Sequence, residues 1–156
     1  MKVARVWEAP RVTLPYAAAE AAVRALWTDR WSHGTTYAVQ WKTNDLSVAP
    51  DPSDTSYWLE LETQFLAERV TAFGAGLGSG ERLLSVRVLI TVNAARGLGD
   101  TTQLTLLDDA VAVFRSQRSG SLSMIGDAVH AIPGPSADGN WWQRHAVAAG
   151  HYRFQG

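Results

Sequence analysis

Two segments of the chain place apolar residues at the three- or four-residue spacing of a helix face. We expect the first helix to begin near Thr13 or Leu14 and to stop at Gly34. Pro15 fits its first turn, because the N–H that proline lacks has no partner there. The residues of its predicted buried face are Ala19, Val23, Leu26 and Trp27.

The second predicted helix follows a turn marked by Gly97 and Gly99. Asp100-Thr101-Thr102-Gln103 resembles a capping box, in which Asp100 caps the helix and the Gln103 side chain reaches back to it. Arg115 and Arg118 lie near the C-terminal end, where the helix dipole favours cations, and Gly120 ends the segment. The predicted buried face consists of Leu104, Leu107, Val111 and Phe114.

Other segments alternate apolar and polar residues, which is the period of a strand with one buried face. The clearest of them covers residues 56–65. Within it, Trp58, Glu60 and Glu62 point away from the apolar side. We expect a polar connection over 42–55, a glycine-rich hairpin tip over 74–80 and a bulge at Gly126. Further predicted strands cover 37–41, 68–73, 84–92, 122–132 and 141–154, the last with a break at Gly150.

This order of elements predicts an α+β fold, in which a mainly antiparallel mixed sheet packs with two helices on one face. The length of 156 residues suits a single domain with its own core. We assign residues 1–12 to an extended N-terminal arm and residues 13–156 to the domain.

Composition excludes several classes of protein. The chain has no cysteine, which excludes disulfides and thiolate chemistry. Its formal net charge of -1 provides no electrostatic footprint for a phosphate backbone and no polybasic signal for a membrane. The N-terminal residues are too charged for a signal peptide, and no apolar run is long enough to span a bilayer, so we expect a soluble, intracellular product.

Candidate catalytic and ligand-binding motifs fail on spacing. The glycine-rich segment 74–80 is followed by Glu81 and Arg82, where a P-loop needs lysine and then serine or threonine. His145 and His151 share a strand face, but about 20 Å separates residues six apart on a strand. Glu60 and Glu62 also share a face, either as an acid–base pair or as a solvated acidic surface. We expect no enzyme, no cofactor and no metal.

The seven tryptophans are an unusual number for a chain of this length. They anchor either the core or subunit interfaces, since aromatic residues are enriched at the centres of protein contacts. The candidate residues for a subunit or tube interface are Trp7, Leu77, Trp141 and Trp142.

The order of motifs from residue 14 to residue 155 resembles the lambda-type tail-terminator family of long-tailed bacteriophages. The shared frame is a helix, a polar loop with prolines, a strand, a glycine hairpin, a valine-rich strand, a helix and an aromatic pair that opens the last strand. The N-terminal arm is longer than this resemblance leads us to expect, and an added interface strand would explain it. The segments that carry the resemblance are Thr55–Leu61, Gly74–Gly80, Ser85–Val92, Gly97–Asp100, Leu104–Phe114 and Ala137–Val147.

The resemblance implies a structural virion protein that forms a hexameric ring of identical subunits. This ring caps the tail tube, ends its polymerisation and joins it to the neck or head–tail connector protein. Genome DNA passes through without specific binding, and no membrane is involved. The protein then belongs to the head-proximal end of the tail, after assembly in the host cytoplasm. Glu60 and Glu62 become candidates for an acidic lumen, and we expect the last strand, from Trp141, to be an edge strand that pairs with a neighbour.

Two alternatives remain from the sequence. A neck or head–tail completion protein would occupy the adjacent ring of the same particle. A monomeric nucleic-acid or small-molecule binding module would instead use exposed tryptophans for stacking.

Overall fold

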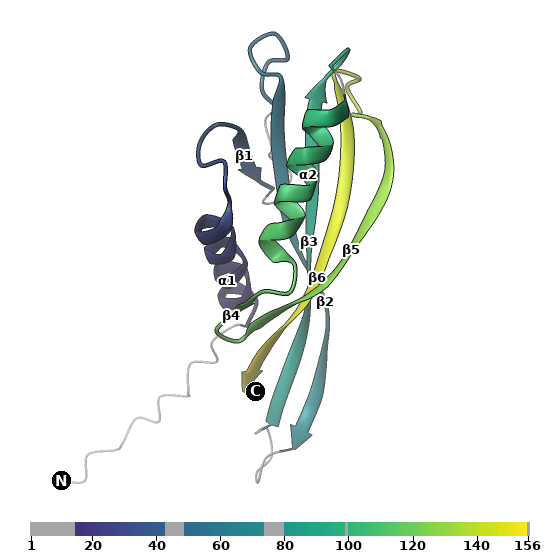
Figure 1. Cartoon of the computed structure of the whole chain (residues 1–156). Coiled ribbons are helices and arrows are strands. Elements are labelled where there is room, and N and C mark those ends of the chain that lie inside the picture. Colours follow the sequence, from purple (N-terminus) through teal and green to yellow (C-terminus); the bar gives the residue numbers. More distant parts are fainter. Residues whose placement is uncertain (1–14, 43–48, 74–79, 99, 156) are drawn as a thin grey trace, which may run out of the picture.

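The structure, a computed structural model, describes residues 15–42, 49–73, 80–98 and 100–155. Within these ranges the chain forms two helices and one six-stranded sheet, which confirms the predicted α+β class (Figure 1). The elements are α1 (Pro15–Arg30), β1 (Ala38–Trp41), β2 (Tyr57–Phe73), β3 (Gly80–Ala95), α2 (Asp100–Phe114), β4 (Arg118–Ser119), β5 (Leu122–Pro135) and β6 (Trp141–Gln155).

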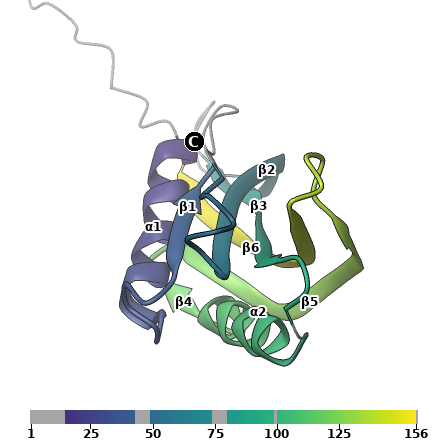
Figure 2. The ribbon, with the colours of Figure 1, turned by 90° about the horizontal axis from the view of Figure 1, so that it is seen from above.

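The sheet has the strand order β1-β2-β3-β6-β5-β4. Only β1 and β2 run parallel, and the other neighbours are antiparallel. The sheet curls into a half-barrel, and both helices lie on its outer side (Figure 2). The opposite side, here called the concave face, is bordered by the turn between β5 and β6.

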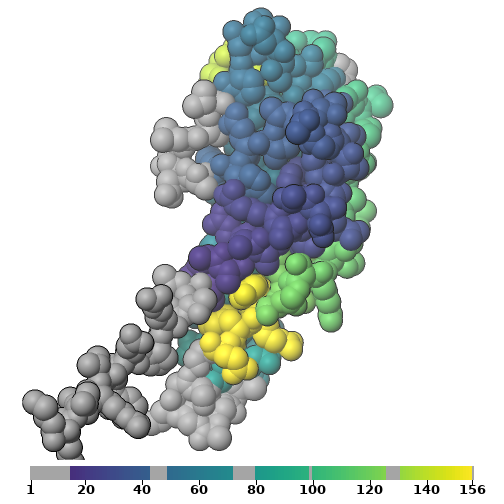
Figure 3. Space-filling model, turned by 90° about the vertical axis from the view of Figure 1, so that its left-hand side faces the viewer, coloured from purple at the N-terminus to yellow at the C-terminus, as the bar shows by residue number. Residues whose placement is uncertain are grey.

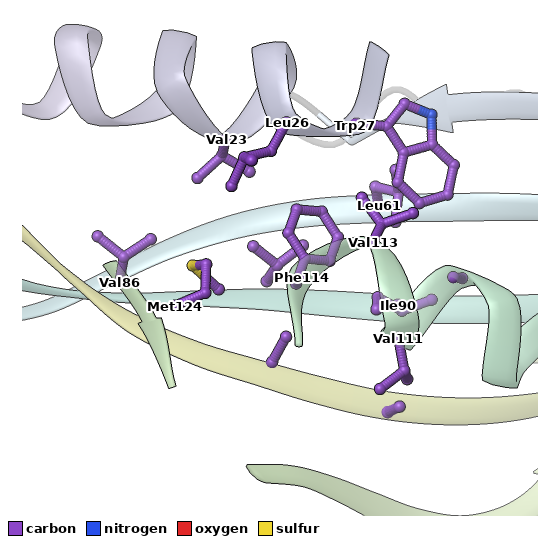
Figure 4. Close-up of a cluster of buried hydrophobic side chains, with 14 of the residues drawn as sticks. Val23, Leu26, Trp27, Leu61, Val86, Ile90, Val111, Val113, Phe114 and Met124 are labelled. Atoms are coloured by element: carbon purple, nitrogen blue, oxygen red, sulfur yellow. The ribbon is translucent and has the colours of Figure 1, made fainter. Parts of the chain in front are cut away.

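The core lies between the helices and the sheet (Figure 4). The predicted face of α1 is confirmed, since Ala19, Val23, Leu26 and Trp27 are all buried. The Trp27 ring stacks on Phe114 of α2 with centroids 6.0 Å apart, which joins the two helices. The apolar side of β3 completes this core with Leu84, Val86, Val88, Ile90 and Val92.

The capping-box prediction for Gln103 is wrong. The Gln103 side chain is buried, and its Nε2 donates hydrogen bonds of 2.8 Å to the main-chain oxygens of Val92 and Trp142. The buried face of α2 therefore includes Gln103, and Leu104, predicted to be buried, is 42% exposed. An amide that satisfies two carbonyls at the ends of β3 and β6 fixes the start of the helix on the sheet.

The second helix ends earlier than the charge pattern suggests. It stops at Phe114, and Ser116 adopts a positive φ of 53°, so Arg118 belongs to β4 rather than to the helix. The predicted strands 56–65 and 68–73 form one strand, β2, with a register shift between Phe65 and Glu68. The bulge expected at Gly126 is confirmed by a register shift between Met124 and Ala128.

The prediction that the last strand is an edge strand is wrong. β6 lies between β3 and β5 and pairs with both. Gly150 does not interrupt it. The side of β6 that faces the core consists of Ala146, Ala148 and Gly150, all buried. Such small residues let the helices and the adjacent strand approach closely, which suits an interior strand.

One part of the sheet extends beyond the helices. Residues 66–73 of β2 and 80–84 of β3, here called the hairpin arm, project past α1 and α2 (Figure 1). The predicted tip residue Leu77 and the N-terminal arm with Trp7 lie outside the described residues. In the part of the chain described, no helix is long and apolar enough to cross a membrane.

Candidate interaction surfaces

The concave face carries an acidic hollow. Glu60 and Glu62 of β2 point into it, because their neighbours Leu59 and Leu61 are fully buried in the core on the other side. Lys42 at the end of β1 lines the same hollow, which leaves two carboxylates against one cation. The remaining lining residues are Leu89, Thr91, Ala137, Gln143 and His145.

His145 is a further titratable group that lines this hollow. Its Nδ1 lies 2.9 Å from the Thr91 hydroxyl, across the pairing of β3 with β6. Burial lowers the pKa of His145 below its ordinary value, and the nearby Glu60 carboxylate acts in the opposite direction. The imidazole is therefore neutral near pH 7, and the net charge of the hollow is negative.

Beside this hollow, two tryptophans lie beneath the turn between β5 and β6. Trp58 and Trp141 are 3% and 1% exposed, and their rings meet edge to face at 5.9 Å. The Asn93 Oδ1 accepts a hydrogen bond of 2.8 Å from Gln143. The Nε1 atoms of both tryptophans and the Nδ2 of Asn93 have no partner among the described residues. All three atoms are buried, and the residues that carry them line a hollow beneath the turn between β5 and β6.

The end of the molecule near the start of α2 has an apolar surface, here called the end patch. Trp142 and Leu98 line one shallow hollow and are 36% and 42% exposed. Asp100 borders it and holds Arg144 of β6 in an ion pair of 3.2 Å. A tryptophan and a leucine beside a fixed ion pair are typical of a protein contact.

The hairpin arm exposes apolar residues at the opposite end of the molecule. Leu66 is 51% exposed and Val70 is 46% exposed. At the base of the arm Glu68 accepts a hydrogen bond of 2.8 Å from the Tyr16 hydroxyl, and it lies 3.6 Å from Arg82. The arm is therefore attached to α1 at its base, while Leu66 and Val70 face solvent.

The outer edge of β5 is the third exposed apolar region. β4 covers this edge only at Leu122 and Ser123. Beyond them Ile125 is 46% exposed and Ile132 is 91% exposed. Unpaired main chain beside exposed isoleucine is a surface to which another strand or side chain can bind.

The candidate interface residues occupy different environments. Trp142 lies at the surface, whereas Trp141 is buried within the protomer, so its ring is not available to a neighbour. Glu60 and Glu62 lie together on the concave face. Sequence reasoning missed Ile132, Leu66 and Leu98, because a single apolar residue at a bulge or beside a turn has no periodic pattern that shows it is exposed.

Among the described residues no group of three histidine, aspartate, glutamate or cysteine side chains is placed to hold a metal ion. The Glu60–Glu62 pair on one strand, with a neutral His145 nearby, can hold protons or a cationic group.

Comparison with known proteins adds the fold and no activity. No family model matches the sequence. No curated protein matches it either. One solved structure, whose name states no activity, aligns with 86% of this chain and 96% of its own, at 14% sequence identity and a TM-score of 0.50. At this identity the likeness describes the fold alone.

Proposed function

We propose that this protein is a tail-terminator subunit, which forms a ring on the end of a bacteriophage tail tube, ends its growth and joins it to the neck. The distribution of exposed apolar side chains supports this proposal most directly. They occur on the end patch, on the hairpin arm and on the β5 edge, rather than in one enclosed pocket. A ring subunit needs such separate surfaces, because it meets two neighbours in the ring and another protein at each end.

The acidic concave face gives secondary support. A ring through which DNA travels must not hold the phosphate backbone, and Glu60 and Glu62 repel it. On this proposal the two glutamates face the lumen.

A monomeric module that stacks bases on tryptophans is the rival from another class. The structure describes every tryptophan except Trp7, and Trp27, Trp58 and Trp141 are buried. Trp31 stacks on Trp27 at 4.5 Å, which occupies one face of its ring. Only Trp142 among those described is classed as exposed, and a single ring is a poor platform for successive bases.

A neck or head–tail completion protein is the rival from the same particle, and it would also form a ring. Electron microscopy of the purified protein mixed with tail tubes separates the possibilities. Rings at one end of the tube are the expected result. A protein that forms no ring and binds no tube end contradicts the proposal, and rings that bind only connectors favour the neck protein. Quenching of tryptophan fluorescence by oligonucleotides in a monomeric protein would favour the binding module.

A further inference from the structure

Three hydrogen-bond donors on the concave face have no acceptor among the described residues. They are the indole Nε1 atoms of Trp58 and Trp141 and the amide Nδ2 of Asn93, and none of these residues is more than 3% exposed. Buried donors in a folded protein are normally paired with protein, water or a ligand, because an unpaired one costs free energy. An indole N–H can only donate, so whatever satisfies it must bring an acceptor.

The three donors belong to neighbouring side chains. Trp58 pairs with Asn93 across β2 and β3, and its ring meets that of Trp141 at 5.9 Å. All three side chains line the hollow beneath the turn between β5 and β6, here called the donor hollow. Trp31 provides a contrast, since its Nε1 is also buried and unpaired but lines neither the donor hollow nor the acidic hollow. One such atom indicates no site, whereas three around one hollow do.

The donor hollow continues into the acidic hollow. Glu60, Ala137 and Gln143 line both of them. Along β2, Trp58, Glu60 and Glu62 follow one another on the same face of the strand, each about 7 Å from the next. The concave face therefore presents N–H donors at one end and carboxylates at the other.

The charges around the two hollows select the kind of ligand. The described lining residues include the carboxylates of Glu60, Glu62 and Asp138, and Lys42 is the only lysine or arginine among them. Burial lowers the pKa of His145, so its imidazole adds no charge near pH 7. An anion is repelled here, while a cation beside the glutamates is complementary.

A lysine or arginine residue within an extended peptide carries both groups that this surface needs. Its main-chain carbonyl has two lone pairs for N–H donors, and the next carbonyls of the chain offer more. Its charged head lies several ångströms away on a flexible stem, so it can reach a carboxylate while the carbonyl stays with the donors.

The helices leave this face open. α1 and the chain leading from it to β1 cover another side of the molecule (Figure 3), and both helices lie outside the half-barrel. Because the three donor atoms are buried, the turn of residues 136–140 must move for a carbonyl to reach them. Ser136 and Asn140 both donate hydrogen bonds to Asp138, so the turn keeps its own structure when it moves.

We propose that the concave face binds a basic peptide segment in extended conformation. Main-chain carbonyls of the peptide accept hydrogen bonds from Trp58, Asn93 and Trp141. The lysine or arginine side chain of the peptide lies against Glu60 and Glu62. This inference goes beyond the proposed function, because it does not require a ring.

The indole N–H signals of the full-length, ¹⁵N-labelled protein provide the test. The probe is the blocked tripeptide acetyl-glycyl-lysyl-glycine amide, and Trp58→Phe and Trp141→Phe assign the two signals. Both signals should move downfield during the titration, while that of Trp142, which lines neither hollow, should not. The same peptide with norleucine in place of lysine keeps the carbonyls and should bind at least tenfold more weakly. Butylammonium, a cation without a carbonyl, should leave both signals in place.

Variants separate the two ends of the site. Glu60→Gln with Glu62→Gln should remove the preference for lysine over norleucine. Asp29→Asn with Asp108→Asn, at exposed positions on the two helices, should keep that preference.

The donor end has its own pair of variants. Trp58→Phe keeps an aromatic ring but removes the N–H, and it should weaken binding of the lysine peptide at least threefold. Trp31→Phe, which removes an unpaired indole outside both hollows, should leave this affinity unchanged.

The contrary outcomes are equally specific. The proposal is overturned if neither indole signal moves at the highest soluble peptide concentration, or if the lysine and norleucine peptides bind equally. Signals that already have the shift of a hydrogen-bonded indole, and that the peptide does not move, would mean that ordered water satisfies the donors, which also overturns it. Peptide binding by a protein that forms no ring keeps this inference and overturns the proposed function. Rings that bind tube ends but no peptide overturn this inference alone.

Discussion

Gly150 of β6 lies so close to Met124 of β5 that no side chain fits between them. A Cβ on Gly150 would stand 2.6 Å from the Met124 sulfur and 2.6 Å from the main-chain oxygen of Ser123. This contact is where the bulge of β5 begins, so glycine is required for the approach of the two strands.

The substitution Gly150→Ala should therefore destabilise the protein by about 1–3 kcal/mol, because backbone must move to admit the methyl group. Urea unfolding measures the loss. Gly134→Ala is the matched control on the same pair of strands, since nothing lies within 4 Å of its Cβ position. Equal stability of the two variants would show that the approach at Gly150 is not tight.

The buried amide of Gln103 supports a second prediction. Gln103→Ala removes two hydrogen bonds and leaves the carbonyls of Val92 and Trp142 without this donor. We expect a loss of about 1–3 kcal/mol in unfolding free energy. Thr102→Ala, at the exposed neighbouring position, should change stability by less than about 0.5 kcal/mol. If Gln103 acted only as a cap at the helix surface, the two variants would differ little.

Local patterns predicted most of the elements. The face of α1 and the alternation along β2 follow from the periods 3.6 and 2, which depend on nearby residues. Gln103 was assigned wrongly because an Asp-x-x-Gln sequence reads the same whether the amide turns back to the cap or reaches the sheet. Only the positions of β3 and β6 decide between the two.

The position of the last strand in the sheet was the main failure. The strand from Trp141 was expected at an edge, yet it lies inside, because strand order depends on contacts between distant segments. The buried small residues Ala146, Ala148 and Gly150 were a signal of close packing that could have indicated an interior strand. Among the candidate surfaces, alternation along residues 56–65 predicted that Glu60 and Glu62 share the face away from the core. The exposure of Ile132 depends instead on a bulge, which alternation does not show.

His145 should make stability depend on pH. The folded protein disfavours the imidazolium because of burial, so below the ordinary pKa of 6.5 the unfolded chain binds more protons than the folded chain. The unfolding free energy should therefore fall as the pH drops from 7.5 to 5.5. The pKa of Asp138 is also lowered, mainly by the Ser136 hydroxyl. Its effect on the unfolding free energy appears near and below its ordinary pKa of 3.8, which is outside the range from pH 7.5 to 5.5.

The comparison variant is His145→Gln, which cannot titrate. Urea midpoints at pH 7.5 and 5.5 should drop less for the variant than for the wild-type protein. The same drop in both proteins would mean that His145 is not the responsible group.

The acidic concave face supports a prediction about DNA. Glu60→Lys with Glu62→Lys turns the proposed lumen basic, and the ring should then bind duplex DNA with an affinity that falls steeply with salt. Filter binding measures this affinity, and in a phage the variant should slow DNA ejection.

A control with the same change in charge is Asp29→Lys with Asp108→Lys, which alters exposed positions on the two helices. This variant should leave DNA ejection unchanged. If charge reversal at Glu60 and Glu62 leaves DNA ejection and infectivity unchanged, these residues do not line the lumen.

The growth of tail tubes tests the central claim most directly. Tubes assembled from purified tube protein are elongated with and without this protein, and their lengths are measured by electron microscopy. We predict that the protein binds tube ends and stops elongation, so that the mean length no longer increases after it is added. Tubes that continue to grow at the same rate, with no density at their ends, would contradict a tail terminator.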